Sequence, residues 1–157
     1  MGPPETAELG GEEVARSLLR QAMADYPQDP ERGDFLIQYA CTQTHDPLSM
    51  YRAVYKFYNR QRLFDLAGAF ALRALAEAGR QGRLPVDPKD WTLEGLSTAG
   101  ADVASNALLA LKAASFIAFR RGDPAEEERY LALLSALDPE DGSGVSVVSA
   151  LAESLGG

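Results

Sequence analysis

Five aspartate–proline dipeptides divide this chain into segments. They are Asp29-Pro30, Asp46-Pro47, Asp87-Pro88, Asp123-Pro124 and Asp138-Pro139. An aspartate side chain can accept the free N–H groups of a first helical turn, and proline needs no donor at the first helical position. We interpret the first, second and fourth dipeptides as helix starts and the last as a helix exit. Glu126, three residues after Asp123, adds the pattern of a capping box.

The composition agrees with a helical fold. The 157 residues include 25 alanines and 21 leucines, but only seven valines and two isoleucines. Alanine and leucine are strong helix formers, whereas β-branched residues are typical of strands. The apolar share of 46% suits one globular domain with a core of its own. We therefore expect an all-α fold and exclude a sheet-rich one.

Apolar residues recur at helical spacing between the dipeptides. Tyr51, Val54, Tyr55 and Tyr58, for example, stand at positions i, i+3, i+4 and i+7. The sequence predicts about seven helices, over residues 12–26, 31–42, 48–60, 63–80, from near 98 or 103 to 121, 124–137 and 144–155. Short connections make successive helices antiparallel neighbours.

Two segments interrupt this pattern. Residues 1–11 contain glycine, proline and glutamate, and we expect them to be flexible. Residues 82–100 contain Gly82, Pro85 and Pro88, which predicts an irregular insertion. Within it, Trp91, Leu93 and Leu96 suit a short helical turn. We expect Trp91 to anchor this connector on the core, with a partner-binding role as the alternative. The remaining residues, 12–157, are predicted to form a single domain.

The termini, the cysteine count and the charge predict location and exclude several partners. Residues 1–11 lack the basic and apolar regions of a secretory signal, and no apolar run approaches the roughly 20 residues of a membrane span. The single cysteine, Cys41, cannot form an intramolecular disulfide, which suits a reducing compartment. We therefore expect a cytoplasmic protein without membrane insertion.

With 15 basic and 23 acidic residues, the net charge of −8 disfavours a nucleic acid as partner.

The spacing of large and small residues resembles a tetratricopeptide repeat, a pair of antiparallel helices of about 34 residues. Three groups of residues carry the resemblance: Tyr51, Val54, Tyr55 and Tyr58 followed by Ala67, Ala71 and Ala74; Ala15, Leu19, Ala22 and Pro27; and Leu111, Ala114, Ser115, Ala118, Gly122, Leu131, Leu134 and the Leu137-Asp138-Pro139 ending. Glu127 departs from the pattern, because the family has a small residue there. Corresponding marks recur after 52 and 60 residues, so the chain resembles a protein with degenerate or interrupted repeats.

The resemblance implies antiparallel hairpins stacked as a short right-handed superhelix. The first helix of each hairpin would line a concave groove that receives an extended or helical peptide. The helix over 144–155 would be the polar cap that such stacks require, or alternatively a face for a homodimer. An unrelated helical bundle is the alternative to the whole interpretation.

A basic and aromatic set of residues is the candidate binding surface within this groove. Arg52, Lys56, Asn59 and Arg60 share one face of the helix over 48–60, and Lys112, Phe116, Phe119 and Arg120 are the matching positions on the later long helix. Arginine binds carboxylates with two parallel bonds and asparagine can donate to them. An acidic peptide or a terminal carboxylate is therefore the expected ligand. The alternative is an ordinary solvated helix face, although Phe116 and Phe119 lie off the apolar stripe and need a burial partner.

The sequence offers little for catalysis, and we expect neither an enzyme nor a metal or cofactor. Cys41 and His45 would share a face of a continuous helix, but no further histidine or cysteine completes a site, and a helix end before Asp46 separates them. The family's two-carboxylate clamp, which grips chaperone C-termini, cannot be matched residue by residue.

The predicted function is a non-enzymatic adaptor that binds a peptide or a partner protein. Two alternatives remain open. One is a small acidic escort chaperone of secretion systems, which size, charge and architecture suit. The other is a helical domain that binds a small molecule in a cavity behind the insertion.

Overall fold

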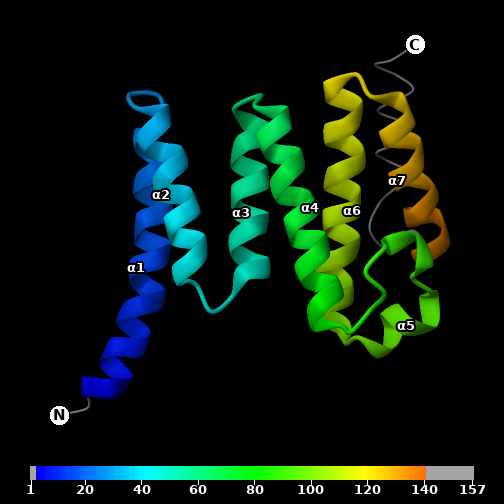
Figure 1. Ribbon diagram of the computed structural model, residues 1–157, viewed down its shortest axis with the longest axis horizontal. Helices are drawn as coiled ribbons and strands as arrows, with labels where there is room; N and C mark the ends of the chain where they lie inside the picture. Colours follow the sequence, from blue (N-terminus) through cyan, green and yellow to red (C-terminus); the bar gives the residue numbers. More distant parts are fainter. Residues whose placement is uncertain (1–2, 141–157) are drawn as a thin grey trace. The chain divides into compact units, whose positions relative to one another are not determined.

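The computed structural model describes the backbone of residues 3–140 and the side chains of residues 10–140. In this part of the chain there are seven α-helices, one short 3-10 helix and no strand (Figure 1). The helices are α1 (Pro3–Asp25), α2 (Pro30–Gln43), α3 (Pro47–Arg60), α4 (Phe64–Gln81), η1 (Pro88–Asp90), α5 (Leu93–Thr98), α6 (Ala101–Arg121) and α7 (Pro124–Leu137). The predicted all-α fold of about seven helices is confirmed.

The structure differs from the sequence prediction at two places. Helix α1 begins at Pro3 and so includes most of the segment expected to be flexible. Two prolines suit a first turn, and the alanine, leucine and glutamates that follow are good helix formers. The predicted short turn is a full element, α5, and completes the seven described helices. The helix predicted over 144–155, with its role as a cap or a dimer face, lies outside the described residues.

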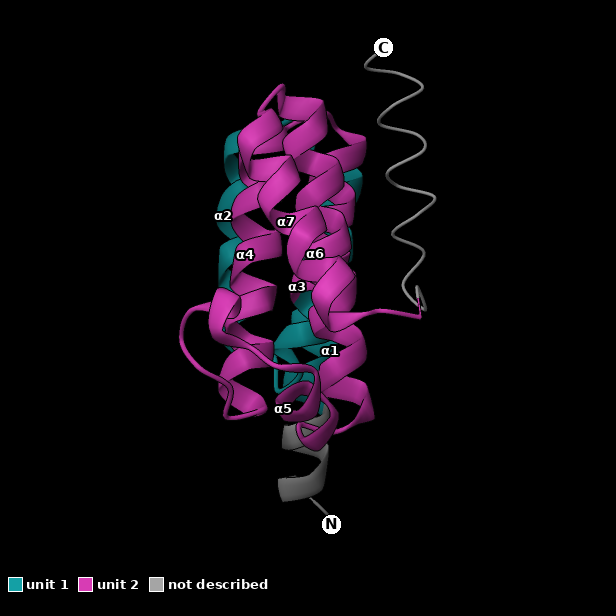
Figure 2. Cartoon of the chain, turned by 90° about the vertical axis from the view of Figure 1, so that its right-hand side faces the viewer, with its two compact units in different colours: residues 1–50 teal, residues 51–157 magenta. Residues whose placement is uncertain are grey.

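The chain divides into two compact units, residues 1–50 and residues 51–157 (Figure 2). The boundary falls near the start of α3, so most of that helix belongs to the second unit. The single domain over 12–157 stays a prediction.

The first unit is a hairpin of α1 and α2. Gly33 on α2 leaves room for the end of α1 and the residue after it, since a Cβ atom there would lie 3.5 Å from the carbonyl oxygen of Ala22 and 2.6 Å from Cδ2 of Tyr26. The Tyr26 hydroxyl donates a 2.7 Å hydrogen bond to Oδ1 of Asp34 on α2. Close packing and this bond fix the end of α1 against the start of α2.

The second unit is built from the C-terminal part of α3 with α4, α6 and α7, and α6 packs against both α4 and α7. Rings of Tyr51 and Tyr58 on α3 lie 6.1 Å and 5.8 Å from the ring of Phe70 on α4. The small residues Ala67, Ala71 and Ala74 of α4 are buried. Small buried residues allow helix axes to approach closely. The α3 rings contact Phe70, and their predicted packing against the alanines stays a prediction.

The aspartate–proline dipeptides have the predicted roles. Side chains of Asp29, Asp46 and Asp123 each accept a hydrogen bond from a backbone N–H three residues later, at the starts of α2, α3 and α7. Asp138 ends α7. The capping box is only half formed, because Glu126 pairs with Arg129 and the N–H of Asp123 bonds to the carbonyl of Ala118.

Trp91 anchors the insertion on α4, as predicted. It is 7% exposed, and its ring lies where a Cβ atom on Gly79 would be 3.0 Å away. Its indole N–H donates a 2.7 Å hydrogen bond to the carbonyl of Pro85. The insertion is therefore an ordered connector that carries η1 and α5.

Helix α6 is the one described helix that is long and apolar enough to cross a membrane by length and composition. A core helix of a water-exposed domain passes the same test. Helix α6 is the central helix of the second unit, and Leu111, Ala114 and Ala118 along it are buried. Core packing therefore accounts for the apolar residues on its buried face.

Candidate functional site

The predicted residues of α3 lie at the surface of the second unit. Arg52, Lys56 and Arg60 are exposed, and Asn59 is half-buried. Burial raises the pKa of the neighbouring Tyr55 hydroxyl, and the charge of Arg52 acts in the opposite direction, so Arg52 lies near that hydroxyl. The Oδ1 atom of Asn59 is buried and has no hydrogen-bond partner among the described residues. A buried acceptor without a donor lowers the stability of the fold by about 1–3 kcal/mol unless a ligand or a water molecule donates a hydrogen bond to it.

The predicted residues of α6 form a cluster at the end of that helix. Phe116, Phe119 and Arg120 are half-buried, as is Lys112 one turn earlier. The rings of Phe116 and Phe119 lie 6.4 Å apart. The guanidinium of Arg120 lies 4.7 Å from the ring centre of Phe64 on α4 and 5.7 Å from that of Phe116. The burial partner that the off-stripe phenylalanines require is thus supplied by their own cluster and by Arg120.

The two predicted sets are not joined into one bonded site. In the described part of the chain, no hydrogen bond, ion pair or ring contact connects Arg52, Lys56, Asn59 or Arg60 with the four residues of α6. The structure brings Phe116, Phe119 and Arg120 together, and it leaves the α3 residues as a separate charged face.

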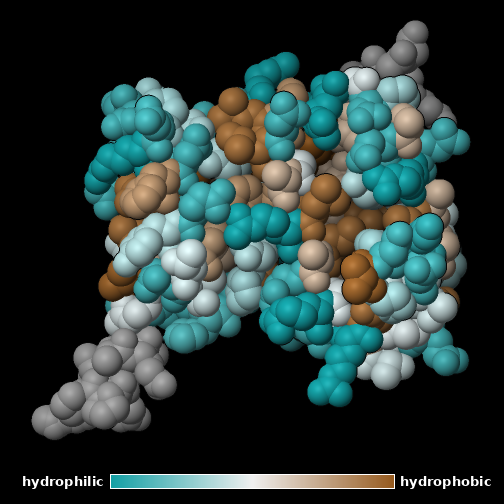
Figure 3. Space-filling view, in the orientation of Figure 1, coloured by the Kyte–Doolittle hydropathy of each residue, from teal (hydrophilic) through white to brown (hydrophobic). Residues whose placement is uncertain are grey.

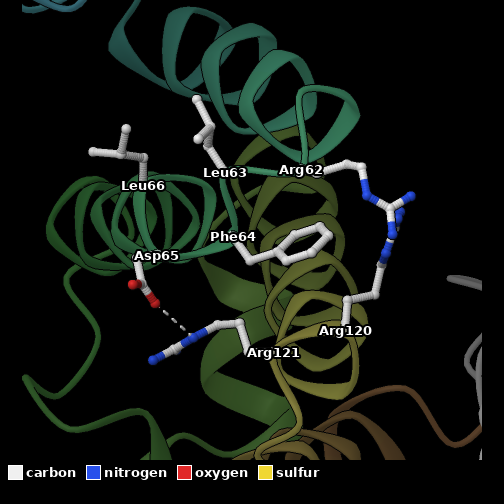
Figure 4. Close-up of a pocket in the computed structure, with 7 residues that line it drawn as sticks. All are labelled: Arg62, Leu63, Phe64, Asp65, Leu66, Arg120 and Arg121. Atoms are coloured by element: carbon white, nitrogen blue, oxygen red, sulfur yellow. Dashed lines mark ion pairs between the residues drawn. The ribbon is translucent and has the colours of Figure 1, made fainter.

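Arg120 lines a pocket of about 620 Å³ in the second unit. The turn between α3 and α4 and the first turn of α4 supply five of its residues, and the end of α6 supplies two (Figure 4). The seven lining residues are Arg62, Leu63, Phe64, Asp65, Leu66, Arg120 and Arg121. We call this cavity the arginine pocket.

Arg62 reaches the pocket from an uncommon backbone conformation. It has a φ of 64°, in the left-handed region that glycine favours. The N–H of Arg62 bonds to the carbonyl of Asn59 and that of Leu63 to the carbonyl of Tyr58, which is the Schellman ending of a helix. Gly122 occupies the equivalent position after α6, with a φ of 75°. At the end of α3, an arginine takes the place that glycine usually fills.

The charges in the pocket are unevenly balanced. Nε of Arg121 lies 3.1 Å from Oδ1 of Asp65, so these two residues neutralise each other. Neither Arg62 nor Arg120 has an ion pair with any residue that the structure describes. In Figure 4 their side chains point toward each other beside the ring of Phe64. Two like charges therefore face one pocket without a counter-charge, in a protein whose net charge is −8.

The pocket also contains the N-terminus of α4. The N-cap residue is Leu63, whose side chain cannot accept a hydrogen bond, so no cap covers the first N–H groups of this helix. A helix N-terminus carries about half a positive charge. It partly offsets the negative ends of α3 and α6, which terminate beside the two arginines.

Sequence reasoning found Arg120 but missed Arg62, Phe64 and the Arg121–Asp65 pair. A signal was present, because basic residues stand at the ends of two helices, in Arg60-Gln61-Arg62 and Arg120-Arg121. Cations near helix C-termini also complement the helix dipole, so the pattern alone does not indicate a site. The meeting of the two helix ends depends on how α3, α4 and α6 pack.

Cys41 and His45 do not lie on one continuous helix. Cys41 is buried in α2, whereas His45 is exposed after the helix has ended at Gln43. Among residues 10–140, no group of three or more His, Cys, Asp or Glu side chains is placed to hold a metal ion.

Comparisons with protein-family models, with curated proteins and with solved structures found no match for this chain. The resemblance to tetratricopeptide repeats therefore stays a prediction, and the site is interpreted from its own chemistry.

Proposed function

We propose that this protein is a non-catalytic interaction module that binds an acidic peptide of a partner protein. The binding surface comprises the arginine pocket, the phenylalanines beside it and the charged face of α3. The observation that carries the proposal is the position of Arg120, stacked on Phe64 and Phe116 at the edge of the pocket.

Stacking prepares Arg120 for binding an anion. The guanidinium lies over the ring of Phe64 and near that of Phe116, and rings so placed hold it by cation–π attraction without using its N–H groups. A guanidinium held in place loses less side-chain entropy when it binds a carboxylate. Phe116 and Phe119 offer apolar contact area for the rest of a peptide.

Asn59 is a half-buried member of the α3 face. Its amide N–H groups can donate to a carboxylate, whereas its Oδ1 is buried out of reach of a peptide at the surface. The charged face formed by Arg52, Lys56 and Arg60 would attract acidic side chains at longer range.

The test is a binding measurement with a fluorescent peptide rich in glutamate and aspartate. We expect the double variant Arg52→Glu with Lys56→Glu and the single variant Arg120→Glu each to weaken binding by about tenfold or more. Arg83→Glu is the matched control, because Arg83 is exposed and outside the pocket. If the double variant and Arg120→Glu both bind the peptide as tightly as the wild type and the control do, the proposed surface is wrong.

The volume of the arginine pocket also fits a small molecule, since ligand pockets span about 300–1,000 Å³. The pocket does not lie where this alternative was expected. The insertion follows the end of α4, whereas the pocket contains its start, and 18 residues of helix place the two about 27 Å apart. A small molecule in this pocket would therefore contact the arginines, and a cavity behind the insertion stays a separate prediction.

A further inference from the structure

We infer that the arginine pocket is a subsite for a phosphate monoester, held between Arg62 and Arg120. This inference rests on the proposed function and specifies which acidic group of the partner enters the pocket. A phosphorylated side chain of a peptide is the expected source.

The charge of the pocket matches a dianion. Asp65 already neutralises Arg121 at 3.1 Å, which leaves the two positive charges of Arg62 and Arg120. A phosphate monoester above its second pKa of about 6 carries two negative charges. A carboxylate carries one and would leave the site positively charged.

The donor geometry also favours phosphate. The side chains of Arg62 and Arg120 come from different helix ends and point toward each other in Figure 4. A phosphate group has three terminal oxygens and can accept a forked pair of bonds from each of two guanidinium groups. A carboxylate has two oxygens and a single negative charge, so it matches two such forks less well. The open N-terminus of α4 lies in the same pocket and favours phosphate further.

The ring of Phe64 gives the subsite a rigid wall. It lies in the pocket lining, with Arg120 stacked on it at 4.7 Å. The pocket of about 620 Å³ has room for a phosphate together with the side chain that carries it. The site is therefore built for a phosphate ester more than for a free inorganic ion.

The first experiment uses phenyl phosphate and benzoate as probes, with chemical shifts recorded for the full chain by NMR. Phenyl phosphate at pH 7.5 should bind at least about tenfold more tightly than benzoate. Its affinity should fall as the pH is lowered from 7.5 to 5, since the dianion becomes a monoanion near pH 6. Equal affinities for the two probes, or no pH dependence for phenyl phosphate, would overturn the inference.

The second experiment assigns the site to the two arginines. Arg62→Gln and Arg120→Gln should each weaken phenyl phosphate binding by about tenfold or more, because each removes a charge-assisted pair of bonds. Arg83→Gln is the control, because Arg83 has the same left-handed backbone, with a φ of 54°, and lies outside the pocket. An equal loss in the control, or no loss at either pocket arginine, would contradict the assignment.

The third experiment separates this inference from the proposed function. It compares three peptides that differ at one position, which is phosphoserine, serine or glutamate. A preference for the phosphoserine peptide that disappears in Arg62→Gln supports both the phosphate subsite and the proposed peptide-binding function. Equal binding of all three peptides overturns the phosphate inference and leaves the acidic-peptide function standing. Binding of phenyl phosphate but of none of the peptides supports the subsite, contradicts the peptide function and identifies a free phosphate ester as the source.

Discussion

The carboxylate of Glu12 on α1 accepts a 2.8 Å hydrogen bond from the backbone N–H of His45, which follows the end of α2. The same carboxylate accepts a bond from the hydroxyl of Thr44 and lies 3.3 Å from Nε of Arg16. Within the first unit, Glu12 thus fixes the chain where it leaves α2.

Glu12→Gln should lower the stability of the first unit. An amide accepts these bonds less strongly than a carboxylate, and we expect a loss of about 1–2 kcal/mol at pH 7. Urea unfolding followed by circular dichroism measures it. Glu13→Gln is the control, because Glu13 is exposed beside Glu12. A loss of the same size in the control would show that a charge alone, and not the bond to His45, is responsible.

The same contact predicts a pH dependence. The hydrogen bond from the His45 N–H holds the pKa of Glu12 below its usual value of 4.5. A carboxyl group with a lowered pKa in the folded state stabilises the fold above its unfolded pKa, and this contribution is lost as the pH falls below about 4.5. The difference in stability between wild type and Glu12→Gln should therefore shrink from pH 6 to pH 3. A difference that stays constant over this range would contradict the role of the ionised carboxylate.

The helices were predictable because their signals are local. Asp29, Asp46 and Asp123 each bond to the helix that they begin, and such a cap needs nothing from the rest of the fold. The start of α1 was missed, since Pro3 follows no capping residue and the first residues lack a clear apolar stripe. The contact of Glu12 with His45 joins residues 33 positions apart, and no local pattern predicts it.

Arg62→Gly should stabilise the protein while it weakens anion binding. Glycine adopts the φ of 64° with little strain, whereas an arginine there costs the fold about 1–2 kcal/mol. We expect a gain of about 0.5–1 kcal/mol after the greater freedom of glycine in the unfolded chain is taken into account. Thermal unfolding gives the gain, and phenyl phosphate titration gives the loss of affinity.

Arg83→Gly serves as the matched variant. Arg83 has a φ of 54° and follows α4 as Arg62 follows α3. It should gain a similar stability and bind phenyl phosphate like the wild type. If Arg62→Gly leaves binding intact, Arg62 stands at this turn for reasons unrelated to the pocket.

The site was only partly predictable from the sequence. Helical spacing correctly grouped Phe116, Phe119 and Arg120, because residues three or four apart share a helix face. It could not bring Arg62 to Arg120, since that meeting depends on the left-handed turn after α3, where neither glycine nor proline marks the chain. On the face shown in Figure 3, apolar and polar residues are interspersed.

Trp91→Ala should release the insertion from α4. The indole ring packs on Gly79 and donates to the Pro85 carbonyl, and removal of a buried tryptophan leaves a cavity that costs about 3 kcal/mol. Hydrogen exchange at η1 and α5 should accelerate, while exchange in the middle of α6 changes less. Leu93→Ala is the control, since Leu93 is 50% exposed. Unchanged exchange in Trp91→Ala would show that the insertion is ordered without its anchor.

Tyr26→Phe should lower the stability of the first unit and alter its response to alkaline pH. The variant loses the 2.7 Å bond to Asp34, and we expect a cost of about 1 kcal/mol at pH 7.

Burial, together with the nearby Asp34 carboxylate, raises the pKa of Tyr26 from 10.0 to about 12. An acid whose pKa is raised by folding holds its proton longer in the folded state, so its contribution to stability is complete below pH 10 and is lost between about pH 10 and 12. Wild type should therefore lose more stability than Tyr26→Phe over this interval, by about 1–2 kcal/mol. Urea unfolding at pH 9, 10 and 11 measures the difference, and parallel losses in the two proteins would show that the Tyr26 hydroxyl ionises at its ordinary pKa.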